Sequence, residues 1–116
     1  MSRDNAYLAD ILESARIILQ HVAGSTRDQF LGDLRTQDAV IRRFEIIGEA
    51  ARHISPETLK VLPDIPWKLV IGMRNILIHD YDDVDAARVW KDTQDDIPLL
   101  IQRIEVYLAA HPPGDG

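Results

Sequence analysis

The stretch DNAYLADILESARIILQHVA (residues 4–23) sets the fold class, because its apolar residues recur every three or four positions. That spacing places them on one side of an α-helix and leaves the other side polar, as in a helix packed against a core. The residues on this stripe are Tyr7, Leu8, Ile11, Leu12, Ala15, Ile18, Leu19 and Val22. We therefore expect a first long helix over 4–23.

Turn residues directly after this stretch predict a short second helix. GSTRD (24–28) interrupts the first helix, and either Ser25 or Thr26 can serve as the N-cap of the next one. The short helix then runs through Phe30 and Leu31.

Further start signals divide the middle of the chain. A second long helix is expected from about 37 to 54, followed by SPE (55–57), in which Ser55 caps a new helix and Pro56 takes its first position. DIPW (64–67) marks a similar start for the segment that follows.

The last helix is expected from about 84 to 110, with Pro98 inside it as a source of a kink. No segment alternates with period two, so the pattern predicts an all-α fold, an up-and-down bundle of four main helices plus short helices. We expect one domain over 1–110 and a flexible C-terminal tail over 111–116.

Composition excludes several kinds of function. The 116 residues contain no cysteine, which rules out disulfides and thiolate chemistry, and no apolar run reaches membrane-spanning length. Residues 1–20 carry acidic side chains unlike those of a secretory signal, so a cytoplasmic protein is expected. The net charge of −6 argues against general coating of nucleic acid, and an RNA contact would need a local basic site.

MRNILIHDY (73–81) places Arg74 and His79 in a run that otherwise reads as a buried helix. With about 100° between successive helical residues, the apolar arc around Val70 covers well over half of the circumference. A helix this apolar is buried on more than one side, and in a small domain the second cover can be another subunit. The pattern therefore predicts a homodimer with this helix at or beside the interface.

The polar residues of this helix have both structural and functional interpretations. Arg74 falls inside the apolar arc, so it must pair with Glu45 or Glu49 or reach an anion at the edge of a cleft. Asn75 and His79 share the narrow polar face, where a histidine near a helix end can be simply a favourable cation. Spacing alone favours the structural interpretation.

The segment RRFEIIGEAARHI (42–54) carries a polar face with the same two interpretations. In the structural interpretation, most of these residues form a solvent-exposed face with ion pairs between residues three or four apart. In the functional interpretation Glu49 fixes Arg74, and cations form a rim that binds phosphate. The candidate rim consists of Arg42, Arg43, Arg52 and Lys68.

The remaining titratable residues suggest no further site. The acidic cluster consists of Asp80, Asp82, Asp83 and Asp85. Helix-start chemistry explains these acids, because unpaired N–H groups favour negative charge, and no complete ligand set accompanies them. We expect no metal and no cofactor. Surface or terminal positions are expected for His21, His53 and His111, and packing roles for Tyr7 and Tyr107.

Two stretches together resemble the HepT-like family of the HEPN superfamily. They are IPWKLVIGMRNILIHDYDDVD (65–85) and, before it, FEIIGEAA (44–51). The specific core of the resemblance is Arg–x4–His–x–Tyr, matched by Arg74, His79 and Tyr81, and the likeness covers nearly the whole chain.

The resemblance implies a homodimer whose two motifs meet in a cleft and act as a metal-independent endoribonuclease on an RNA substrate. In this interpretation His79 transfers protons, Arg74 stabilises the phosphate and Asn75 orients His79 or the substrate. It also implies the toxin half of a toxin–antitoxin pair, with a cognate nucleotidyltransferase of the MNT type as antitoxin. That partner would silence the toxin by attaching AMP to Tyr81.

Two alternatives stay open on the sequence. The chain could be a non-catalytic subunit that binds nucleotide or docks a nucleotidyltransferase, which the acidic net charge favours somewhat. It could also be a structural dimer in which Arg74 is merely paired with Glu49.

Overall fold

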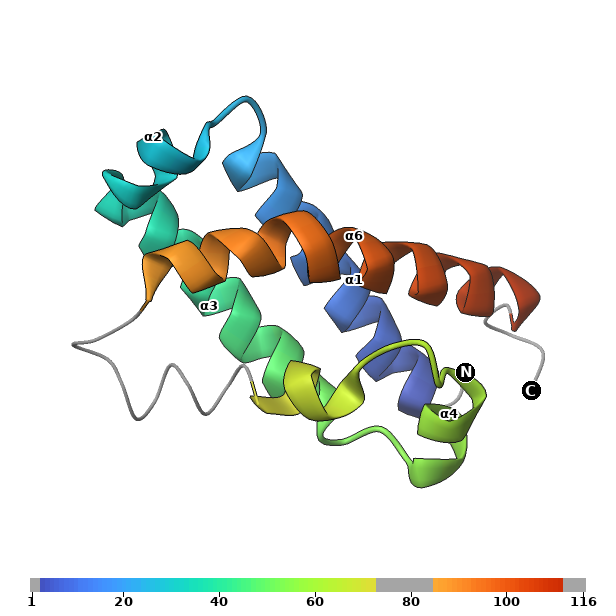
Figure 1. Cartoon of the computed structure of the whole chain (residues 1–116). Helices are drawn as coiled ribbons and strands as arrows, with labels where there is room; N and C mark the ends of the chain where they lie inside the picture. The colour runs from blue at the N-terminus through green and yellow to red at the C-terminus, as the bar shows by residue number, and fades with distance from the viewer. Residues whose placement is uncertain (1–2, 73–84, 112–116) are drawn as a thin grey trace.

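The computed structural model describes residues 3–72 and 85–111, and within those ranges it contains helices and turns without a β-strand (Figure 1). The all-α prediction is therefore confirmed, whereas the up-and-down arrangement and the dimer stay predictions. The helices are α1 (Arg3–Val22), α2 (Arg27–Leu31), α3 (Leu34–Ala51), α4 (Pro56–Val61) and α6 (Ala86–Ala110), and residues 67–72 form a further helical segment.

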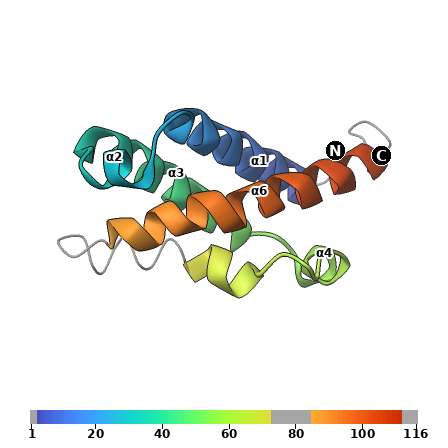
Figure 2. The same cartoon turned by 45° about the horizontal axis from the view of Figure 1, so that its top comes forward.

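Helix α1 is the central element of the domain, since it packs against both α3 and α6. Helix α6 crosses α1 and α3, while α2 lies at one end of the molecule and α4 at the other (Figures 1 and 2). The short helix α2 contacts both α3 and α6. None of the described helices combines the length and apolar character that crossing a membrane requires.

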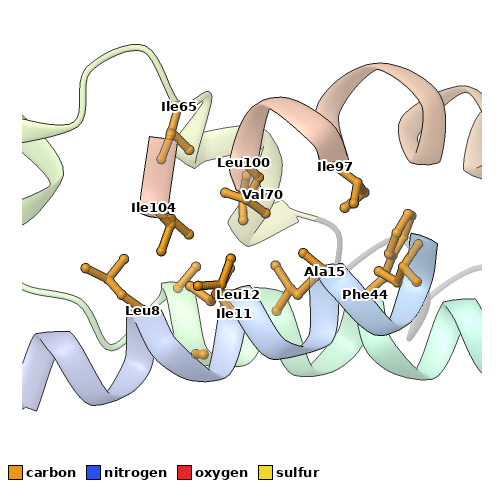
Figure 3. Packing of buried hydrophobic residues seen from close by; sticks show 14 of the residues in the cluster. Leu8, Ile11, Leu12, Ala15, Phe44, Ile65, Val70, Ile97, Leu100 and Ile104 are labelled. Atoms are coloured by element: carbon orange, nitrogen blue, oxygen red, sulfur yellow. The ribbon is translucent and has the colours of Figure 1, made fainter. Parts of the chain in front are cut away.

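The apolar stripe of α1 forms the middle of the core, as its spacing predicts. Leu8, Ile11, Ala15 and Ile18 have no exposed surface, and Figure 3 shows members of this stripe facing the apolar residues of α6. Burying one leucine or isoleucine side chain contributes about 1.5–3 kcal/mol, so this stripe is a major source of stability. Tyr7 and Leu19, at the edges of the stripe, are half-buried and pack against the cluster.

The start of α2 follows the expected capping chemistry and selects Thr26 over Ser25. The Thr26 hydroxyl accepts the Gln29 N–H at 3.2 Å, and the Gln29 side chain accepts the Thr26 N–H at 2.9 Å. Both bonds satisfy N–H groups that the helix cannot pair itself. Gly24 turns the chain just before them with φ +76°, a conformation that glycine adopts without strain.

Helix α3 begins and ends three residues earlier than expected. Asp33 starts it, because one carboxylate oxygen accepts the Thr36 N–H at 3.1 Å. Gln37, the expected first residue, is instead buried inside the helix, and its amide nitrogen donates to the carbonyls of Phe30 (2.8 Å) and Leu31 (3.1 Å). Gln37 thereby adds side-chain donors to the last carbonyls of α2, one of which, that of Phe30, also accepts the Asp33 N–H at 3.1 Å.

Helix α4 begins at Pro56 with Ser55 at the N-cap, as expected, but the Ser55 side chain makes no capping hydrogen bond. The Ser55 hydroxyl instead donates to Asp4 of α1 at 2.5 Å, and the Ser55 N–H donates to the other carboxylate oxygen at 3.1 Å. Thr58 donates to the same carboxylate at 2.6 Å. The Asp4 carboxylate thus accepts three hydrogen bonds from Ser55 and Thr58. Because hydrogen bonds to a charged acceptor are strong, Asp4 attaches the start of α4 to the first turn of α1.

Removal of the Asp4 carboxylate should destabilise the domain. Burial acts to raise the pKa of Asp4, but the hydrogen bonds from Ser55 and Thr58 outweigh it, and the pKa lies below 3.8. Such a group stabilises the fold above its unfolded pKa, and the contribution is lost as pH falls through the folded pKa. We predict that Asp4→Ala lowers the free energy of unfolding in urea by about 2 kcal/mol at pH 7 and by less near pH 3.

Glu13→Ala is the matched control, because Glu13 is an exposed acid on the same helix. It should change the free energy of unfolding by less than about 0.5 kcal/mol. An Asp4→Ala loss that stayed the same at both pH values would contradict the assigned role of the carboxylate.

Candidate functional site

The motif residues Arg74, Asn75, His79 and Tyr81 fall within 73–84 and so lie outside the described residues. The same holds for three of the four acids of the predicted helix start, Asp80, Asp82 and Asp83. The structure defines the chain on both sides of this segment and the polar surface of α3.

The helical segment 67–72 anchors the chain directly before the motif. Val70 is 2% exposed and lies beside Leu100 of α6, above the α1 stripe (Figure 3). Trp67 is buried as well, and its indole N–H donates to the Leu62 carbonyl at 3.0 Å. These contacts hold the residues four and seven positions before Arg74 in the core.

Helix α6 anchors the chain directly after the motif. Its N-cap is Asp85, which accepts the Arg88 N–H at 3.2 Å, so one of the four predicted acids does perform helix-start chemistry. Val89 is buried one turn later. The ends of the segment that carries the motif are therefore both tied to the core.

Gly72 is the last described residue of the upstream helical segment. A Cβ atom placed there would meet no other atom of the described structure within 4 Å. Close packing within this chain therefore does not require a glycine at this position.

Glu49 is the centre of an ion-pair network on the outer side of α3. Its carboxylate lies 3.4 Å from Nε of Arg52 and 3.2 Å from Nε2 of His53. The predicted pairing of Glu49 with Arg74 involves a residue outside the described ranges and stays a prediction. Glu49 presents its carboxylate toward solvent on a surface that also carries an imidazole and a guanidinium.

A groove with a volume of about 460 Å³ runs between α1 and α3 beside this network. Tyr7 of α1 stacks on His53, with ring centroids 5.3 Å apart and planes inclined by 18°. The Arg3 guanidinium lies 5.9 Å from the centroid of the Tyr7 ring. The groove is lined by Tyr7, Asp10, Arg42, Glu45, Ile46, Glu49, Ala50 and His53.

The prediction that His53 occupies the surface is confirmed, because its side chain is 37% exposed. His21 and His111 are exposed too, and the His111 ring stacks on Tyr107 at 4.2 Å. Tyr7 and Tyr107 pack against the core as expected, and each also carries a histidine on its ring.

The four candidate rim cations do not form one continuous rim. Arg42 pairs with Glu45 at 3.3 Å on the groove side of α3. Because helical residues advance by about 100°, Arg43 and Arg52 leave α3 on opposite sides. Lys68 is exposed on the segment 67–72. With Asp10, Glu45 and Glu49 also on the groove, cations do not dominate it.

The described residues hold no group of three or more histidine, aspartate or glutamate side chains arranged to bind a metal ion. The groove residues can instead accept and donate hydrogen bonds and stack against a planar group.

The first turns of α6 carry a buried carboxyl that sequence reasoning missed. The Asp92 side chain is 11% exposed and lies 3.5 Å from Nε of Arg88. Burial raises the pKa of Asp92 to about 6; the Arg88 guanidinium opposes the shift and the neighbouring Asp96 adds to it. In the sequence the only signal was an acid at an otherwise core-facing position of the helix, one turn after Val89.

The described residues define a small all-α domain with a polar groove on α3 and a core that anchors the motif segment at both ends. The chain belongs to the Ribonuclease HepT-like family, whose model matches residues 11–107.

Similar proteins occur in archaea and bacteria. A Methanocaldococcus jannaschii protein with a provisional RNase name is 39% identical over 101 residues, which cover 87% of this chain and 93% of the relative. A Thermococcus cleftensis protein, provisionally named ribonuclease HepT, is 41% identical over 85% of this chain and 90% of its own. A Caldanaerobacter subterraneus relative with a provisional RNase name is 32% identical over 93% of this chain and 96% of its own. No solved structure gives a significant match.

Replacement of Asp92 by asparagine should stabilise the domain at neutral pH. The pKa of Asp92 in the folded state is raised from 3.8 to about 6. The folded protein therefore binds the Asp92 proton more tightly than the unfolded chain does, and the stability that this provides is present below pH 4 and lost as pH rises through 6. Asparagine carries no charge to desolvate. After allowance for the lost Arg88 pair, we predict that Asp92→Asn raises the free energy of unfolding by about 1–2 kcal/mol at pH 7.5 and changes it little at pH 4.

Asp95→Asn serves as the control, since the Asp95 side chain is 59% exposed. It should show no comparable gain at pH 7.5. Equal changes in the free energy of unfolding at pH 4 and pH 7.5 on Asp92→Asn would contradict the conclusion that burial raises the pKa of the Asp92 carboxyl.

Proposed function

We propose that this protein is the toxin of a toxin–antitoxin pair and acts as a metal-independent endoribonuclease. The observation that carries the proposal is family membership over 11–107 together with the Arg74–x4–His79–x–Tyr81 pattern inside the matched region. The RNase names of the relatives support the same activity.

The proposed chemistry needs only groups that the chain and the RNA provide. The 2′-hydroxyl of one nucleotide attacks the adjacent phosphorus and loses its proton to a base, while the bond to the 5′-oxygen of the next nucleotide breaks and that oxygen gains a proton. The products are a 2′,3′-cyclic phosphate and a 5′-hydroxyl. His79 transfers protons near neutral pH, and Arg74 offers a permanently charged, planar donor to the phosphate oxygens.

The proposed catalytic unit is a homodimer. Each motif contains one histidine, and the reaction uses both a base and an acid, so two motifs facing each other across a two-fold axis supply the pair. Asn75 orients His79 or the substrate, and Glu49 supports Arg74. Val70 and Val89, which flank the motif segment in the chain, are both buried, so the chain enters and leaves this segment at the core.

His79→Ala should abolish RNA cleavage. Removing a group that transfers protons in the transition state costs a factor of about 100 or more, so we predict at least that loss in the cleavage rate of total RNA. EDTA should leave the parent rate unchanged, because no metal takes part. The measurement is the rate of RNA fragmentation by the purified proteins at pH 7.

His21→Ala is the matched control, because His21 is an exposed histidine on α1. It should cut RNA like the parent. A His79→Ala protein that cuts RNA at the parental rate in EDTA would overturn the nuclease assignment.

The partner in the proposal is a nucleotidyltransferase antitoxin that transfers AMP to the Tyr81 hydroxyl. The phenolic oxygen attacks the α-phosphorus of ATP, and pyrophosphate leaves. The added group brings bulk and negative charge to the place where the substrate phosphate would bind, which explains why the modification would stop cleavage.

Mass spectrometry after co-expression with the genetically neighbouring nucleotidyltransferase tests this step. We predict an added AMP on the parent protein, localised to Tyr81, and none on Tyr81→Phe. An AMP attached to another residue, or an unmodified Tyr81 in a silenced complex, would contradict the proposed regulation.

The second candidate function is a non-catalytic subunit that docks a nucleotidyltransferase or binds nucleotide. The net charge of −6 and the carboxylates of the α3 groove favour it, because both weaken attraction to RNA. Cleavage by the unmodified chain alone separates the two candidates.

A further inference from the structure

A second groove, distinct from the one beside Glu49, lies between α2 and the first turns of α6. It has a volume of about 470 Å³. Three cations line it, Arg27 from α2 and Arg88 and Lys91 from α6, whereas Asp85 is the single carboxylate on its wall among the described residues. Among the residues that line the groove, cations therefore outnumber carboxylates by three to one, on a molecule with a net charge of −6.

The ion pairs of Arg27 and Lys91 are weak, so both side chains can still bind an anion. Lys91 lies 3.8 Å from Asp95, and both side chains are more than half exposed, so solvent screens the pair. Arg27 lies 3.8 Å from Asp28, also in solvent. Such contacts are longer than strong charge-assisted hydrogen bonds, and phosphate oxygens can replace them.

Arg88 differs from the other two, because a buried group orients it. Its Nε faces Asp92 at 3.5 Å, and the Asp92 side chain is turned inward with 11% exposure. A guanidinium has five N–H donors, so the contact through Nε holds the side chain while the terminal nitrogens can serve a ligand.

Trp90 adds an aromatic surface between these cations. It lines the groove, it is half-buried, and its ring packs on the buried Phe30 of α2 with centroids 5.4 Å apart. Phe30 therefore supports the indole from the core side. A supported aromatic ring next to several cations is the arrangement by which proteins bind single-stranded nucleic acid, with bases stacked on the ring and phosphates on the cations.

We infer that the α2–α6 groove binds a single-stranded segment of RNA, with Arg27, Arg88 and Lys91 on phosphates and a base on Trp90. This deepens the proposed function and rests on it, because it gives the nuclease an RNA-binding surface beginning at Asp85, where the described chain resumes after the motif segment. The three rim cations of α3 are paired or divided between two sides of that helix, which makes this groove the better basic surface for RNA.

Binding of a fluorescein-labelled oligoribonucleotide of twelve nucleotides tests the inference directly. All proteins carry His79→Ala, so that the measured Kd does not depend on whether the chain cleaves RNA. We expect Lys91→Glu to raise Kd about tenfold and to reduce the slope of log Kd against log salt by about 0.7, the value for one lost phosphate contact on a single strand. Arg88→Ala should weaken binding in the same direction.

Lys60→Glu is the matched control, since it makes the same change in net charge on α4, at the other end of the molecule from α2 (Figure 1). It should bind RNA like the parent. Equal losses for Lys60→Glu and Lys91→Glu would overturn the inference, because they would mean that net charge alone governs binding.

Trp90 provides a second, independent readout. The chain has two tryptophans, Trp67 and Trp90, so Trp67→Phe leaves Trp90 as the sole indole emitter. We expect RNA to quench its fluorescence at saturation, in parallel with binding. Unchanged Trp90 emission at saturating RNA would contradict the stacking part of the inference.

Kinetics distinguishes failure of this inference from failure of the proposed function. If the parent cuts RNA, Lys91→Glu should raise KM for a long RNA by a larger factor than it changes kcat. Cleavage with unchanged Kd and KM in the groove variants overturns only the groove. Groove-dependent binding without cleavage in the parent overturns only the nuclease.

A protein ligand is the competing occupant of this surface. Groove variants that keep parental RNA affinity but no longer form a complex with the partner nucleotidyltransferase would overturn the inference.

Discussion

Burial of the α1 stripe against α3 and α6 is the interaction on which the remaining structure depends. Leu8, Ile11, Ala15 and Ile18 are completely removed from solvent, and the helices on either side supply the matching apolar surface. The same core receives Val70 from the segment before the motif and Val89 from the helix after it. A loss of packing in the middle of the domain would therefore release the chain on both sides of the motif segment at once.

Polar groups then decide how the short elements attach to this core. Asp4 holds α4, and Gln37 holds the end of α2, each by placing a side-chain donor or acceptor where a helix end lacks a partner. These contacts join residues from different helices. They fix the ends of the molecule, while the apolar stripe fixes its centre.

The sequence predicts the helices well, because apolar period and capping residues are local signals. Such signals predict the first helix and the α4 start at Pro56. They restrict the α2 N-cap to Ser25 or Thr26, and the structure selects Thr26. Ser55 occupies the N-cap position as predicted, but its hydroxyl and its N–H both donate to Asp4, which lies fifty-one residues earlier in the chain. No local rule contains that contact.

The surface of the candidate site, too, has features that the sequence predicts and features that depend on tertiary packing. The exposure of His53 and the polar face of α3 could be anticipated from helical spacing. The stacking of His53 on Tyr7 and the placing of Arg27 beside Arg88 and Lys91 could not, since each depends on how two helices pack. Helical periodicity marks Arg74 and His79 as unusual residues in an apolar segment, but their catalytic interpretation comes from the family resemblance.

The most direct measurement of the central claim uses an RNA with one 2′-deoxynucleotide on the 5′ side of a mapped cleavage site. Attack by the 2′-hydroxyl predicts no cleavage at that bond and normal cleavage at unmodified sites in the same molecule. Cleavage at the deoxy position would contradict the account, because the nucleophile would then have to come from water or from the protein.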